Sequence, residues 1–253
     1  DSHAQDGAAI VRFVAWLEAS LEDEEDHDVP TEYTALQQLQ ALRAEAHVDA
    51  PMHATCASGP NGALKDYTPA ESGCRTLKES DVLVLTAGSE DGAARLSRTL
   101  HFGSPSPQQR LCFSSALKAH IAVANSVFPA DTTGSVLDTL ARAPMWQAGL
   151  DCTRPALCPQ ELPLQAGMCV GNEACYSKPG AFGVRLGGAM WVIPAHTGPR
   201  DATPRFLRLH SLGMAPFQLR MLQLSLLSFH PWRSRRTVMH KTARPLSASW
   251  RGW

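Results

Sequence analysis

Apolar residues recur at helical spacing in two stretches near the start of the chain. The stretch from Gly7 to Leu21 contains no proline and predicts an amphipathic helix. The stretch from Thr31 to Arg43 predicts a second helix, because a threonine followed by good helix formers is typical of a helix N-terminus. Thr34 and Ala35 leave the first turn of this second helix undecided.

The next segments predict strands and a turn. From Thr55 to Pro69 the composition changes to small residues and turn formers, which predicts a strand that runs into a tight loop. The Asn61-Gly62 pair within it predicts a turn, because both residues tolerate a positive φ. The apolar run from Asp81 to Gly88 predicts a buried strand, and the alternating run from Ser97 to Gly103 predicts another.

Helical and extended patterns alternate in the second half. Pro107 to Phe128 predicts a long helix, and Val136 to Trp146 predicts another despite Pro144 near its end. Later strand candidates are Met168–Val170, Phe182–Leu186 and Ala189–Ile193, whereas Cys152–Leu162 shows little sign of regular structure. This order predicts one α+β domain over residues 1–227, followed by a basic, disordered tail over residues 228–253.

Composition agrees with a globular domain. The chain has 253 residues, of which 44% are hydrophobic and 19% charged, and this excludes a wholly disordered protein. It contains no apolar run of about 18 residues and no signal-peptide pattern at its start, so we expect a cytoplasmic protein with no membrane partner. The 7 cysteines include no C-x-x-C pair, which favours reduced thiols over a disulfide framework or a zinc site.

The formal net charge of -1 hides a strong asymmetry along the chain. Residues 1–50 carry 12 acids and 2 Lys/Arg, whereas residues 174–253 carry 12 Lys/Arg and a single acid. The acidic run from Glu22 to Asp28 predicts a solvated linker. The basic tail contains tryptophans, but disorder is the simpler interpretation, so we expect no nucleic-acid partner.

Four segments carry a family resemblance: Ser58–Ala63, Arg98–Pro105, Leu117–Val123 and Gly180–Leu186. In this order they closely resemble the cytosolic Xaa-Pro aminopeptidases, which are aminopeptidase P enzymes of the creatinase and methionine aminopeptidase superfamily. The resemblance extends from Ser2 to Leu227. It implies a pita-bread fold, in which helices flank a curved antiparallel sheet in two pseudo-symmetric halves. It also implies two divalent ions, usually manganese, held by two Asp, one His and two Glu.

The resemblance leaves one of these five metal-ligand positions with its ligand. Thr86 and Arg95 stand at the two aspartate positions, and Gly187 stands at the second glutamate position. The glycine-rich signature that carries the histidine is missing after Asp151, so we expect a fold that is incomplete in its second half. Glu173 alone retains a metal ligand, and one carboxylate binds Mn²⁺ only weakly.

Neighbouring residues do not replace the lost ligands. Glu90 and Asp91 lie in a loop that is shorter than the family pattern, and Asp66 stands where the family has a further active-site histidine. The positive charge of Arg95 opposes metal binding, so we expect Glu173 to pair with Arg95 or Arg185 and no metal cofactor to be held.

No other catalytic centre is apparent. The sequence contains no H-E-x-x-H, G-x-S-x-G, P-loop or dinucleotide motif, and Cys56 and Cys112 lie in apolar settings typical of core packing. We therefore expect a diverged, catalytically inactive domain that binds peptides or proteins. Two alternatives are an active two-metal aminopeptidase, which releases the residue ahead of proline, and a decayed reading frame.

The family also implies partners. They are a peptide with proline at its second position and a second copy of the chain, because family members of this type commonly form homodimers through this domain. The two amino-terminal domains of full-length relatives are expected to be absent.

Overall fold

The computed structural model describes residues 2–22, 29–46, 52–89, 95–158, 161–195, 206–212 and 217–222. The predictions for residues 23–28, for Glu90 and Asp91, and for the tail at 228–253 fall outside these ranges. The described helices are α1 (Ser2–Glu22), α2 (Glu32–Glu45), α3 (Pro107–Ala124), α4 (Gly134–Gln147) and the short 3₁₀ helices η1 (Gly59–Ala63) and η2 (Leu219–Met221). The strands are β1 (Met52–Ser58), β2 (Leu83–Ser89), β3 (Arg95–Leu100), β4 (Val127–Pro129), β5 (Leu157–Cys158), β6 (Cys169–Lys178), β7 (Phe182–Pro194) and β8 (Phe206–Ser211).

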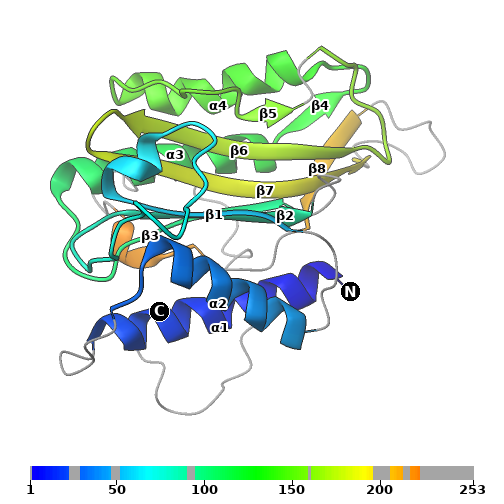
Figure 1. Cartoon of the computed structure of the whole chain (residues 1–253). Helices are drawn as coiled ribbons and strands as arrows, with labels where there is room; N and C mark the ends of the chain where they lie inside the picture. Colours follow the sequence, from blue (N-terminus) through cyan, green and yellow to red (C-terminus); the bar gives the residue numbers. More distant parts are fainter. Residues whose placement is uncertain are drawn as a thin grey trace, which may run out of the picture.

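The strands form one antiparallel sheet in the order β1-β2-β3-β7-β6-β5, and β8 joins β4 to the far part of β7. Figure 1 shows α1 and α2 beside the β1–β3 half, and α3 and α4 beside the β6–β5 half. The register of β3 on β7 makes Ser97 the partner of Gly187. Residues that pair between neighbouring strands point to the same face of the sheet. The strand side chains that pack against α1 and α2 and those that pack against α3 and α4 therefore point to one common face, which both helix pairs cover. The opposite face, to which Ser97 and Gly187 belong, is left open for a cleft.

Two apolar clusters hold the helices to this covered face. One joins α1 and α2 to β1–β3 and includes Phe13, Leu17 and Leu85. The other joins α3 and α4 to β6–β8 and includes Phe113, Leu186 and Met145. Burying these side chains supplies the main driving force for both halves. No helix in the described ranges is both long and apolar enough to cross a membrane.

The four predicted helices are confirmed, with one corrected boundary. The first turn of α2 is closed by threonines: Thr34 N donates to Thr31 Oγ1 at 3.1 Å, and Thr31 N donates to Thr34 Oγ1 at 2.8 Å. Pro144 lies inside α4, as expected. The prediction that the third helix reaches Phe128 is wrong. It ends at Ala124, and Phe128 is buried in β4 because that strand pairs with β8.

The predicted strands are confirmed in place but not in length. Phe182–Leu186 and Ala189–Ile193 are parts of the single strand β7, because Gly187 continues the ladder with a φ of 153°. The predicted turn at Asn61-Gly62 is present as a 3₁₀ helix, but neither residue has the positive φ expected of it. Both residues lie in η1, and the positive φ at this bend belongs to Gly59, at 50°.

Candidate functional site

Three of the positions at which the resemblance implies metal ligands lie in one row on the open face of the sheet. Thr86 pairs with Ser97 between β2 and β3, and Ser97 pairs with Gly187 between β3 and β7. Gly187 in turn pairs with Glu173 between β7 and β6. Segments far apart in the sequence are thus brought side by side by strand register alone. Arg95 begins β3 opposite Gly88, and its side chain is outside the described part of the structure.

The polar side chains in this row are bonded to one another. Ser97 Oγ donates to Glu173 Oε2 at 2.6 Å, and Thr86 Oγ1 lies 3.2 Å from Ser97 Oγ. On the other carboxylate oxygen, Arg185 Nε lies 3.6 Å from Glu173 Oε1. Of the two predicted partners of Glu173, Arg95 and Arg185, the pair with Arg185 is confirmed, and the side chain of Arg95 lies outside the described part of the structure. Ser97 is buried. The sequence does not identify it as a site residue, because a single serine in a strand matches no motif.

A two-metal centre does not fit these residues. Two hard cations need several anionic oxygens, whereas this row offers one carboxylate, two neutral hydroxyls and a glycine. Both carboxylate oxygens already face donors, one on Ser97 and one on Arg185. Within the described ranges, no group of three or more His, Cys, Asp or Glu side chains is placed to hold a metal ion.

The segment after Asp151 forms an edge of the sheet. Thr153 N donates to Cys175 O at 3.2 Å, and Glu173 N donates to Ala156 O at 2.6 Å. The following strand β5 pairs with β6. The sequence predicts a loss of structure here, but backbone hydrogen bonds hold the segment against β6. Its course brings Arg154 to the cleft.

A small pocket opens between this edge, η1 and strands β1 and β2. Its free volume is about 40 Å³. Its charged lining residues are Asp66, Arg154 and Arg185, and the others are Thr55, Ala57, Asn61, Gly62, Leu64, Tyr67, Val84 and Thr86. Arg154 Nη1 lies 3.7 Å from Asp66 Oδ1. The pocket is therefore lined by Thr86, one of the positions at which the resemblance implies a metal ligand, and by two arginines.

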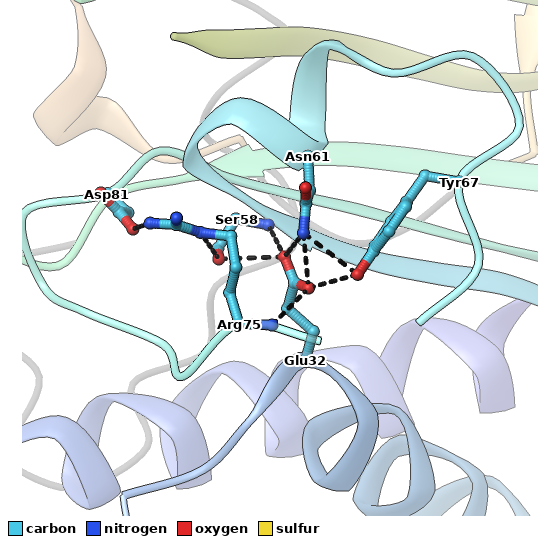
Figure 2. Close-up of polar contacts among 6 residues, drawn as sticks. All are labelled: Glu32, Ser58, Asn61, Tyr67, Arg75 and Asp81. Atoms are coloured by element: carbon cyan, nitrogen blue, oxygen red, sulfur yellow. Dashed lines mark hydrogen bonds and ion pairs between the residues drawn. The ribbon is translucent and has the colours of Figure 1, made fainter. Parts of the chain in front are cut away.

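A buried carboxylate supports the pocket from behind. Glu32 is fully buried at the start of α2, and Figure 2 shows it at the centre of a polar cluster. Its Oε1 accepts hydrogen bonds from Ser58 N at 2.6 Å and Ser58 Oγ at 3.0 Å. Its Oε2 accepts from Tyr67 OH at 2.5 Å, Asn61 Nδ2 at 2.9 Å and Arg75 N at 3.0 Å.

This cluster fixes two pocket residues, Asn61 and Tyr67, in place. Burial and the hydrogen bond to Glu32 raise the pKa of Tyr67, so its hydroxyl keeps its proton and continues to donate. The sequence identifies Glu32 only as part of a helix start. Its partners lie 26 to 43 residues away, and no local pattern announces such contacts.

Comparison with known proteins identifies the lineage. Residues 1–193 match the profile of metallopeptidase family M24. The chain belongs to this family. The predicted pita-bread fold class and the aminopeptidase P resemblance are both confirmed, the fold through solved M24 relatives.

Individual relatives are named as aminopeptidase P proteins, in agreement with this family. The chain is 32% identical over 267 residues to "Aminopeptidase P1" of Lotus japonicus, and 33% identical over 254 residues to "Probable Xaa-Pro aminopeptidase P" of Laccaria bicolor. These matches cover 90% of this chain but 41% and 39% of the relatives.

A solved X-prolyl aminopeptidase from Caenorhabditis elegans superposes with a TM-score of 0.78 at 26% identity, over 89% of this chain and 40% of that one. That protein is described as a cytosolic enzyme with a di-nuclear active site. The M24 domain described above therefore spans about two fifths of the length of such relatives.

Proposed function

We propose that this M24 domain is a catalytically inactive descendant of the Xaa-Pro aminopeptidases, and that it binds peptides or proteins through its cleft without cleaving them. One observation carries the proposal. Glu173, the single retained ligand, is bonded to Ser97 and faces Arg185, and its strand partner is a glycine. A carboxylate used in this way is a structural group and not a metal ligand.

Electrostatics favours the same conclusion. Two divalent ions would bring four positive charges to a row that holds one carboxylate, Glu173, which Arg185 already faces at 3.6 Å. The sheet itself does not need the ions, because the row of side chains is joined by its own hydrogen bonds. Loss of the metals is therefore compatible with a folded domain.

The cleft keeps features that suit a binding role. The Glu32 cluster holds Asn61 and Tyr67 at the pocket, and the pocket combines polar donors with small apolar side chains. The ligand we propose is a peptide with proline at its second position, by analogy with relatives named as Xaa-Pro aminopeptidases. A cytosolic location follows from the same analogy. Homodimerisation is also part of this proposal.

The test is to offer the protein an Arg-Pro-Pro peptide in the presence of Mn²⁺. We expect calorimetry to detect binding and mass spectrometry to detect no released arginine. The matched control is Glu173→Gln, which should behave like the wild type. Mn²⁺-dependent release of arginine that disappears in Glu173→Gln would contradict the proposal and favour an active metallo-aminopeptidase.

A further inference from the structure

We propose that the pocket beside Arg154 binds a peptide carboxylate, which comes from the C-terminus or from an acidic side chain. Arg154 is the anchor, and Arg185, which pairs with Glu173, also lines the pocket. The inference rests on the proposed function above, because it assigns a chemical class of ligand to the same cleft.

The guanidinium of Arg154 has donors to spare. It carries five N–H donors. Among the described residues its one acidic partner is Asp66, and Arg154 donates no hydrogen bond to it. The distance of 3.7 Å from Nη1 to Asp66 Oδ1 is too long for a hydrogen bond. Only 29% of the Arg154 side chain is exposed, so the pocket has removed much of its water. A partly desolvated cation with unused donors favours an anionic ligand.

The charges around the pocket select the sign of the ligand. Arg154 and Arg185 both line it, and since Arg185 is paired with Glu173, Arg154 is the positive charge that a ligand meets. Asp66 is the competing anion in the lining, but 71% of its side chain is exposed. Water therefore weakens its attraction for Arg154. A ligand carboxylate that reaches further into the pocket displaces this weak pair.

Size and shape select the kind of anion. The free volume of about 40 Å³ is enough to admit a small group such as a carboxylate. The planar fork of an arginine also matches a carboxylate with two parallel hydrogen bonds. Ala57, Val84 and Leu64 form the apolar part of the lining and suit a small apolar side chain next to the anion.

Calorimetry with two pairs of blocked peptides tests the inference. The first pair is acetyl-Ala-Ala and its C-terminal amide, and the second is acetyl-Glu-Ala-amide and acetyl-Gln-Ala-amide. We expect the charged member of at least one pair to bind about tenfold more tightly than its neutral partner. The pair that shows the difference identifies the source of the carboxylate.

Three variants assign the effect to Arg154. Arg154→Gln should abolish the preference for the charged peptide. Arg12→Gln makes the same change of charge at an exposed position of α1 and should leave the preference intact. Asp66→Asn removes the competing anion and should tighten binding by roughly threefold, a gain that a damaged fold does not produce.

The outcomes separate this inference from the proposed function. Equal binding of charged and neutral peptides, or an unchanged preference in Arg154→Gln, overturns the carboxylate site and leaves peptide binding in place. Displacement of the peptide by an equal concentration of inorganic phosphate overturns the peptide as its ligand. Absence of binding by all four peptides overturns the carboxylate site, whereas the proposed function is tested by the Arg-Pro-Pro peptide. Catalysis is tested separately, since these blocked peptides offer no free amino terminus.

Discussion

Glu173 and Gly187 are direct partners across β6 and β7, so the retained carboxylate lies opposite a residue with no side chain. The φ of Gly187 is 153°, in a region that residues with a Cβ avoid. A Cβ built there would lie 2.0 Å from Asn172 O and 2.6 Å from Glu173 Cα. In this strand conformation the backbone leaves no space for a side chain at position 187.

Gly187→Glu should destabilise the domain and should not restore a metal ligand. The backbone clash and the unfavourable φ predict a loss of about 2 kcal/mol or more in the free energy of unfolding, measured with urea. Gly171→Ala in β6 is the control, because a Cβ there meets no atom within 4 Å. A Gly187→Glu protein as stable as the wild type, with increased affinity for Mn²⁺, would contradict this account of the strand.

The bond from Ser97 to Glu173 should contribute measurably to stability. A double-mutant cycle of Ser97→Ala and Glu173→Ala isolates it, because each change removes one partner. We expect a coupling energy of about 1 to 2 kcal/mol in urea unfolding, since the acceptor is charged and the donor is buried. Additive effects of the two substitutions would show that the row is not energetically connected.

Glu32→Gln should destabilise the domain, because Glu32 holds the polar cluster behind the pocket. The amide turns a donor toward groups that already donate to Glu32, so we expect a loss of about 2 kcal/mol or more in the free energy of unfolding. Glu45→Gln is the control, because Glu45 pairs with Arg12 on the surface and its side chain is 58% exposed. Its effect should be below about 1 kcal/mol. Equal effects of the two substitutions would show that the Glu32 cluster stabilises the domain no more than a surface ion pair does.

Stability should fall in mild acid because of His120. Burial, with the charge of Arg98 as a second cause, lowers the pKa of His120 to about 4. Between that value and the ordinary pKa of about 6.5, the unfolded chain binds the proton and the folded chain does not. The contribution of His120 to stability is therefore complete above about pH 6.5 and decreases as the pH falls toward 4.

Urea unfolding from pH 7 to pH 5 measures this dependence. His120→Gln should flatten the decrease, although burial also lowers the pKa of His101, which contributes in the same direction. His210→Gln is the control at an exposed histidine and should leave the slope unchanged. A slope that is identical in the wild type and His120→Gln would rule out His120 as its cause.

Local signals predicted much of the fold. Helical spacing located α1 and α2, and the apolar run from Asp81 placed β2, because these elements bury one face or one whole segment. Gly187 misled the prediction of β7, since a glycine in a strand signals an end unless its neighbours in the ladder are known.

The site was predictable only in part. Alignment of motifs located Thr86, Gly187 and Glu173, but strand register alone shows that they form one row with Ser97. The edge formed after Asp151 depends on backbone hydrogen bonds to β6, which side-chain chemistry does not encode. Contacts between distant segments are therefore the part that the sequence left open.

The number of manganese ions bound per chain, measured by elemental analysis after equilibrium dialysis, tests the central claim most directly. Since Glu173 is engaged by Ser97 and Arg185, we predict no tightly bound ion in the wild type and no change in Glu173→Gln. Two ions per wild-type chain, lost in Glu173→Gln, would contradict the account.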